Sequence, residues 1–126
     1  MTLPSIDNIH LGRIAPCLGV RDIQAALAFY SSVFGFQKVF ENGDPVGFMV
    51  LKKDSAELHL SHCRDYQPPR FNVAHLFVDN VDMLYARCAD AQVRILKGLR
   101  DKDYGQRAFV FADPDGNRID VGERVG

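Results

Sequence analysis

The chain has 126 residues, a formal net charge of −1, and lysine and arginine side chains that are scattered along its length. A chain with this small net charge and scattered basic residues has no basic surface for nucleic acid or an anionic membrane, so we expect neither as a partner. The apolar content is sufficient for the core of one domain over residues 1–126. We expect a cytoplasmic protein, because no apolar run is long enough to cross a bilayer and no signal peptide is recognisable.

The first half of the chain predicts a strand, a helix and then three strands. Asp22 suits the N-terminal cap of a helix with apolar residues at helical spacing, and Gly35 is placed to end it in a left-handed turn. Asn42-Gly43-Asp44-Pro45 is a strong turn signal between two strands. We expect the strands at residues 14–20, 37–40, 46–51 and 57–61, within a first module over residues 13–62.

The second half repeats this series after a linker at residues 63–70, where Pro68 and Pro69 favour an extended chain that cannot join a sheet. A helix should begin at Asp79 or Asn80 and end near Ala91. Residues 97–105 are expected to form a loop that could fold over the binding face as a flap. We expect the strands at residues 72–78, 93–96, 106–112 and 118–122, within a second module over residues 71–123.

The two halves are related by an internal repeat. Val20 and Val78, each at the junction of a strand and a helix, are 58 residues apart, and the last strands repeat at an offset of 61 residues, from Leu58 to Ile119. A duplicated βαβββ unit explains both offsets. The predicted fold class is therefore α+β, with two βαβββ modules that form a curved mixed-sheet cup, completed in a homodimer.

Alternation along the strands sorts the side chains onto two faces. One face is apolar throughout and should lie under the helices, whereas the other mixes small, aromatic and ionisable side chains, which is typical of a binding site. Parity leaves open whether Phe109 and Phe111, or Val110 between them, point into the cup. The candidate ligand-binding residues are Glu57, His59, His75, Phe77, Asp103, Tyr104, Phe109, Phe111 and Asp120.

His59 and Asp120 occupy equivalent positions in the two modules, 61 residues apart, and we expect them to contact each other. The simpler alternative is that His59 is a structural histidine held by Asp120, Ser61 or a backbone group, and the same alternative applies to His75. The three cysteines are widely spaced and form no Cys-x-x-Cys pair. We expect reduced thiols, with no disulfide, no structural zinc and no catalytic nucleophile.

Several short motifs between residues 14 and 123 carry a resemblance to a known family. They are Val20-Arg21-Asp22 leading into Ala28-Phe29-Tyr30, Gly35-Phe36 after that helix, Leu58-His59-Leu60-Ser61, and Phe111-Ala112-Asp113-Pro114-Asp115-Gly116-Asn117. Together they resemble the vicinal oxygen chelate superfamily, of the glyoxalase, bleomycin resistance protein and dioxygenase type. The resemblance implies paired βαβββ modules, usually in dimers, with the site in a cleft between two modules.

The resemblance also bears on metal binding. In metal-dependent members it implies ligands at four repeat-related positions, which are Ala15, His59, Val73 and Asp120 in this chain. Alanine and valine offer no lone pair, whereas a catalytic divalent ion usually needs three protein ligands. We therefore expect no cofactor. The alternative is one divalent metal on His59 and Asp120, completed by a displaced ligand such as His75 or Glu57.

The chain looks closest to the metal-free, bleomycin-resistance branch, whose members bind an antibiotic without changing it. We accordingly expect a small-molecule binding protein, not an enzyme, that sequesters a bleomycin-like glycopeptide and so confers antibiotic resistance. The alternative is a metal-dependent lyase, isomerase or dioxygenase of the same fold, with an incomplete or displaced ligand set. Such an enzyme would be glyoxalase-like or dioxygenase-like, and fold analogy alone does not choose between the two functions.

Overall fold

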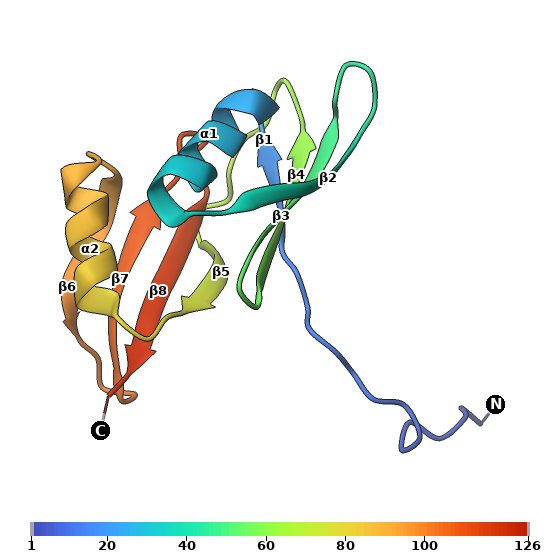
Figure 1. Cartoon of the computed structure of the whole chain (residues 1–126). Coiled ribbons are helices and arrows are strands. Elements are labelled where there is room, and N and C mark those ends of the chain that lie inside the picture. Colours follow the sequence, from blue (N-terminus) through green and yellow to red (C-terminus); the bar gives the residue numbers. More distant parts are fainter. Residues whose placement is uncertain (1, 126) are drawn as a thin grey trace.

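The computed structural model describes residues 2–125 and contains two successive βαβββ modules (Figure 1). The first module consists of β1 (Cys17–Val20), α1 (Ile23–Phe34), β2 (Gln37–Asn42), β3 (Phe48–Lys53) and β4 (Ala56–His62). The second consists of β5 (Asn72–Phe77), α2 (Val81–Asp90), β6 (Arg94–Asp101), β7 (Gln106–Ala112) and β8 (Arg118–Arg124). The predicted α+β fold with a duplicated βαβββ unit is thereby confirmed.

Each module forms its own mixed four-stranded sheet. Sheet A has the strand order β1-β4-β3-β2 and sheet B has the matching order β5-β8-β7-β6. The first strand of each module runs parallel to the last, and the other neighbours are antiparallel. This leaves β1 and β5 at sheet edges, each with one unpaired side.

The helices begin at the side-chain caps that the sequence predicts. Asp22 accepts a hydrogen bond from the Ala25 backbone N–H at 3.1 Å, and Gly35 ends α1 in the left-handed region at φ +77°. Asn80 caps α2 in the same way. Within residues 2–125, neither helix is long and apolar enough to cross a membrane.

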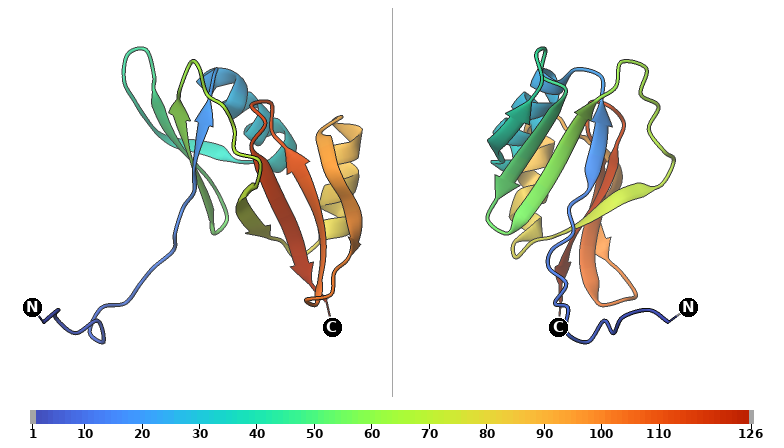
Figure 2. Two further views of the ribbon diagram at one scale, coloured as in Figure 1. Left: turned by 180° about the vertical axis from the view of Figure 1, so that it is seen from behind. Right: turned by 90° about the vertical axis from the view of Figure 1, so that its right-hand side faces the viewer.

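A single core joins the two modules because α1 packs on both sheets. Tyr30 and Phe34 are buried on this helix, against the inner face of sheet A, and Phe34 stacks on Phe111 of β7 with ring centroids 4.8 Å apart. Helix α2 covers the other end of sheet B, where Tyr85 meets Phe109 edge to face at 5.1 Å. Since α1 lies between sheet A and the second module, the outer face of sheet A points away from that module (Figures 1 and 2).

Two segments differ from the predicted elements. Strand β1 begins at Cys17 instead of residue 14, because Ile14 is 96% exposed and Pro16 has no N–H for a ladder. The loop predicted at residues 97–105 is wrong over most of its length, because β6 continues to Asp101 through two register shifts against β7. Only residues 102–105 remain as a tight hairpin tip, which is too short to serve as a flap.

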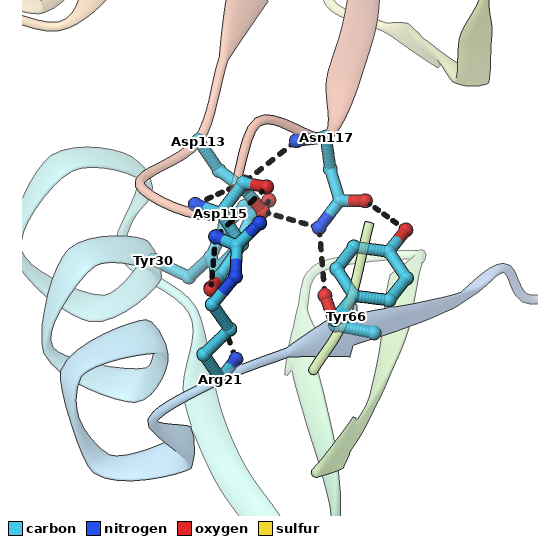
Figure 3. A network of polar contacts seen from close by, with 7 residues as sticks. Arg21, Tyr30, Tyr66, Asp113, Asp115 and Asn117 are labelled. Atoms are coloured by element: carbon cyan, nitrogen blue, oxygen red, sulfur yellow. Dashed lines mark hydrogen bonds and ion pairs between the residues drawn. The ribbon is translucent and has the colours of Figure 1, made fainter. Parts of the chain in front are cut away.

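A buried polar network links the turn between β7 and β8 to the first module (Figure 3). Asp113 accepts hydrogen bonds through one carboxylate oxygen from the backbone N–H groups of Asp115 and Asn117, both at 2.9 Å. Its other oxygen accepts from the Tyr30 hydroxyl at 2.7 Å and from the Asn117 side chain at 3.0 Å. Burial raises the pKa of Asp113, against the lowering effect of these hydrogen bonds, and raises the pKa of Tyr30.

Asn117 extends the network to β1 and to the linker. Its amide nitrogen donates to the Gly19 carbonyl at 2.9 Å, and its oxygen accepts from the Tyr66 hydroxyl at 2.5 Å (Figure 3). The Arg21 backbone N–H donates to the Asp115 carboxylate at 2.9 Å. Gly19 is required here, because any Cβ at this position would collide with the Tyr66 ring. The turn therefore acts as a joint between modules.

Candidate functional site

The outer faces of the two sheets, opposite the helices, carry most of the ionisable side chains that the sequence analysis singled out. On sheet A these are Glu57 and His59 of β4, and on sheet B they are His75 of β5 and Asp120 of β8. The apolar residues that alternate with them, such as Leu58 and Leu60, are buried under α1. Parity alone thus separated these four side chains from the core.

On sheet A, His59 is paired with a carboxylate of its own strand. Its Nε2 lies 2.7 Å from Glu57 Oε2, and the Phe48 ring meets the imidazole edge to face at 5.5 Å. Glu57 also forms ion pairs with Arg13 at 3.1 Å and Lys52 at 3.7 Å. The hydrogen bond from His59, followed by these cations, lowers the pKa of Glu57 and keeps it a carboxylate.

On sheet B, His75 is paired with Asp120 of the neighbouring strand. The distance from His75 Nδ1 to Asp120 Oδ2 is 2.9 Å, and these side chains are 29% and 17% exposed. Phe77 is 66% exposed and meets the His75 ring edge to face at 4.5 Å. Both sheets therefore present a histidine and carboxylate pair beside an aromatic ring.

Gly122 and Gln106 lie next to His75. A Cβ on Gly122 would collide with Gln106 Oε1 and come within 3.1 Å of the His75 ring, so the glycine makes room for both groups. Among the described residues, Gln106 Oε1 is the buried side-chain oxygen that accepts no hydrogen bond. Sequence reasoning missed Gln106, because only the fold brings it to His75.

The predicted contact between His59 and Asp120 is wrong within the chain. Each has another partner, because His59 reaches Glu57 along β4 and Asp120 reaches His75 across the parallel pair of β5 and β8. Equivalent positions in a repeat need not be neighbours when each module builds its own sheet. The two equivalent positions still have a common feature: His59 and Asp120 each belong to a histidine–carboxylate pair on the outer face of their own sheet.

Phe109 and Phe111 lie in the core and not in the cup. Their side chains are 0% and 1% exposed and pack on the helices, so Val110, opposite Asp120, occupies the outer face. Tyr104 lies at the hairpin tip, 61% exposed, where partial burial and the charge of Asp120 raise its pKa. Asp103 is exposed at the same tip, and the role of both residues at the rim of a binding site stays a prediction.

A pocket of about 440 Å³ opens between the modules and is bordered by three of the candidate residues. Glu57 contributes from sheet A, and His75 and Phe77 contribute from sheet B. Buried aromatic rings, including Phe34, contribute to its lining, and so do Arg13, Ile14 and Pro16 ahead of β1. Its size and its apolar wall with a few polar groups are those of a small-molecule pocket.

Within one chain, the donor set does not fit a catalytic divalent metal. Ala15 and Val73 occupy two of the four positions that the family resemblance assigns to ligands, and neither side chain has a lone pair. Within residues 2–125 of one chain, no three His, Cys, Asp or Glu side chains come together. Each sheet by itself supplies one histidine and one carboxylate, which is fewer protein ligands than such an ion usually takes.

Comparison with known proteins places the chain in a family. The sequence pattern of the Glyoxalase/Bleomycin resistance protein/Dioxygenase superfamily matches residues 10–121. Metallothiol transferase FosB of Lysinibacillus sphaericus (strain C3-41) is 24% identical over 128 residues, which cover 95% of this chain and 82% of FosB.

Two solved structures illustrate the similarity of fold. A bleomycin-binding protein crystallised in complex with bleomycin has a TM-score of 0.76 at 22% identity, over 90% of this chain and 99% of that chain. A superfamily member from Sphaerobacter thermophilus DSM 20745 has a TM-score of 0.76 at 26% identity, over 90% of this chain and 98% of that chain. The sequence match over residues 10–121 and the shared fold show that the chain belongs to the Glyoxalase/Bleomycin resistance protein/Dioxygenase superfamily.

Proposed function

We propose that this protein binds a small organic molecule of the bleomycin type without changing it chemically. The observation that carries the proposal is the pairing of each outer-face histidine with a carboxylate beside an aromatic ring, in His59–Glu57–Phe48 and His75–Asp120–Phe77. Rings of this kind offer stacking surfaces, and carboxylates attract cationic groups of a ligand. The set includes hydrogen-bonding anchors and no activated nucleophile.

We further propose that the complete binding cleft forms in a homodimer. The outer face of sheet A points away from the second module, so the two outer faces do not enclose one cup within the chain. The free edges of β1 and β5 are available for pairing with another chain. A two-fold dimer that sets sheet A of one chain against sheet B of another would create two equivalent clefts.

A second candidate is a metal-dependent transferase, which is favoured by the 24% identity to FosB over 95% of the chain. It would need a displaced ligand set, because Ala15 and Val73 cannot ligate; in the proposed dimer cleft the available donors are Glu57 and His59 of one chain with His75 and Asp120 of the other. Metal analysis of protein purified without chelator separates the candidates. A stoichiometric divalent ion together with a converted substrate would support the transferase.

Calorimetric titration with bleomycin tests the proposal directly. We expect saturation near one ligand per chain, the same affinity with and without chelator, and ligand recovered with unchanged mass. His75→Ala should weaken binding by about 10-fold to 100-fold, since a charge-assisted hydrogen bond contributes about 1.5–3 kcal/mol. His62→Ala is the matched control, because His62 is exposed at the end of β4 and outside both pairs. Conversion of the ligand, or no binding, would refute sequestration.

A further inference from the structure

The two outer-face histidines are each bound to a group that accepts hydrogen bonds and cannot donate one. His59 Nε2 lies 2.7 Å from the Glu57 carboxylate, and His75 Nδ1 lies 2.9 Å from that of Asp120. An ionised carboxylate has no proton to give, so the ring nitrogen that faces it must carry one. A neutral imidazole has a single N–H, which leaves its other nitrogen with an unshared electron pair. The free acceptor atoms are therefore His59 Nδ1 and His75 Nε2.

The surroundings of Glu57 hold its histidine in this arrangement. Glu57 Oε1 accepts from Arg13 at 3.1 Å and lies 3.7 Å from the Lys52 ammonium, so Oε2 is left for His59. Arg13 is itself fixed by a second hydrogen bond, to the Ser55 carbonyl at 3.2 Å. Two cations beside one oxygen favour the ionised carboxylate and oppose its rotation. His59 is thereby held as the tautomer that carries its proton on Nε2.

The protein itself leaves both free nitrogens unused. Within residues 2–125, neither His59 Nδ1 nor His75 Nε2 makes a hydrogen bond, and the two side chains are 27% and 29% exposed. His75 Nε2 lies beside Gly122, where a Cβ would come within 3.3 Å of it. A polar atom on an open face that has no partner in the protein is satisfied by water or by a ligand. Each sheet therefore offers one acceptor nitrogen on its outer face.

We propose that the ligand is held at two points by N–H groups of its own, which donate to His59 Nδ1 and to His75 Nε2. This inference rests on the proposed function, since it requires a small molecule on the outer faces, and it adds which chemical groups that molecule presents. In the homodimer cleft proposed above, the two histidines come from different chains.

The groups next to the histidines narrow the ligand class further. The carboxylates behind the imidazoles add negative charge, so amidinium, guanidinium or ammonium N–H groups are favoured. A carboxylate or phosphate on the ligand only accepts, and it would meet two electron pairs with no donor between them. Phe48 and Phe77 lie edge to face with the two imidazoles and offer ring faces to a flat cation. The ligand class is therefore an aromatic compound with cationic N–H donors.

Imidazole ¹⁵N NMR of the full chain at pH 8 tests the tautomers before any ligand is added. A ring nitrogen without a proton resonates far downfield of one that carries a proton, and exchanging tautomers give averaged signals. We expect a proton on His59 Nε2 and on His75 Nδ1. Averaged signals, or two protonated nitrogens on each ring, would overturn the proposal.

Substitution of each carboxylate tests what holds the tautomers. Glu57→Gln should average the signals of His59 alone, and Asp120→Asn those of His75 alone, because an amide can both donate and accept. Glu41→Gln removes an exposed carboxylate from β2 of the same sheet and is the matched control, which should change neither histidine. Unchanged His59 signals in Glu57→Gln would contradict the assigned role of that carboxylate.

Benzamidine and benzoate test the ligand class, because they share one ring and a flat head group and differ in hydrogen bonding. Benzamidine is cationic and donates, whereas benzoate is anionic and accepts. With chelator present to keep metal ions from the free nitrogens, benzamidine should cause saturable upfield shifts of His59 Nδ1 and His75 Nε2, and benzoate should cause none. Benzoate shifts at these atoms, or no benzamidine shift at about 50 mM, where fragments of this size ordinarily bind, would overturn the proposal.

The donor requirement and the proposed function can fail separately. A benzamidine response without bleomycin binding would refute a bleomycin-type ligand and support the donor requirement. Bleomycin binding that leaves both free nitrogens unshifted would overturn the donor requirement and support sequestration.

Discussion

Replacing Asn117 by alanine should remove much of the stability of this protein, because the side chain is fully buried at the joint between modules. Three hydrogen bonds would be lost, with the Gly19 carbonyl, the Asp113 carboxylate and the Tyr66 hydroxyl. Each contributes about 1 kcal/mol, and a buried partner left unsatisfied costs about 1–3 kcal/mol. We therefore expect a loss of about 3–5 kcal/mol, from a total of about 5–15 kcal/mol for a typical domain.

Urea unfolding followed by circular dichroism measures this loss. With a slope of about 1.5 kcal/mol per molar urea, the midpoint should fall by about 2–3 M. Protein concentration must be held fixed, since dimerisation would add to the apparent stability. Asn42→Ala, at an exposed position at the end of β2, is the matched control and should change stability by less than about 0.5 kcal/mol.

Tyr66→Phe separates the network from a simple packing effect. It removes one hydroxyl and should cost about 1 kcal/mol. Combined with Asn117→Ala it should add less than its own single cost, because both substitutions remove the same hydrogen bond. The joint described above would be refuted if Asn117→Ala shifted the midpoint no further than Asn42→Ala, or if the two losses were strictly additive.

Three further outcomes can be checked independently. Burial raises the pKa of the Cys88 thiol to about 11, so iodoacetamide at pH 8 should modify the two exposed cysteines and spare Cys88 until the protein is unfolded. Mass spectrometry of the folded protein that showed Cys88 modified as fast as the other two would contradict this prediction. Gly122→Ala places a Cβ against Gln106 Oε1 and 3.1 Å from the His75 ring, so both side chains should shift and ligand affinity in titration should fall by about tenfold, whereas Gly47→Ala adds a Cβ in open space and should leave the affinity unchanged. The lowered pKa of Glu57 means that its carboxylate stabilises the fold above its unfolded pKa and that this contribution is lost as pH falls through the folded pKa. The urea midpoint of Glu57→Gln should consequently decline less than that of wild type between about pH 5 and pH 3, and parallel declines would contradict this assignment.

Local signals account for the parts of the fold that sequence reasoning predicted. Asp22 and Gly35 mark the ends of α1 through caps that depend only on neighbouring residues. In strand β4, Leu58 and Leu60 point to the core, whereas Glu57 and His59 point to the outer face, so the sequence predicts both faces of the strand. The duplication then carried these assignments to the second module.

Strand β7 lacks such a signal. Residues 108–112 are all buried, so alternation does not separate the core side from the outer side, and the position of Phe109 and Phe111 depended on where the helices pack. The extension of β6 beyond its predicted end depends on bulges that involve its partner strand.

The candidate site shows the same division. His59 and His75 were found by parity, whereas Asp120 was assigned to His59, because its actual neighbour, His75, is set by the register between β5 and β8. Nothing in the sequence pointed to Gln106, because its buried oxygen without a hydrogen-bond partner, next to Gly122, is a property of the folded structure. How two chains pack against each other depends on the shape of their folded surfaces, so the alternation of residues along a strand does not predict it.

The joint at residues 113–117 has a consequence for how the protein is made. Asp113 lies 83 residues after Tyr30, and Asn117 lies 98 residues after Gly19, so the first module is translated long before its polar partners exist. A nascent chain that ends before β7 would present the Tyr30 hydroxyl and the Phe34 ring without the side chains that cover them. Contacts this distant in sequence form slowly, and exposed apolar surface in the interval favours aggregation. Ribosome-bound chains cut short before residue 112 should therefore engage chaperones that the finished protein does not need.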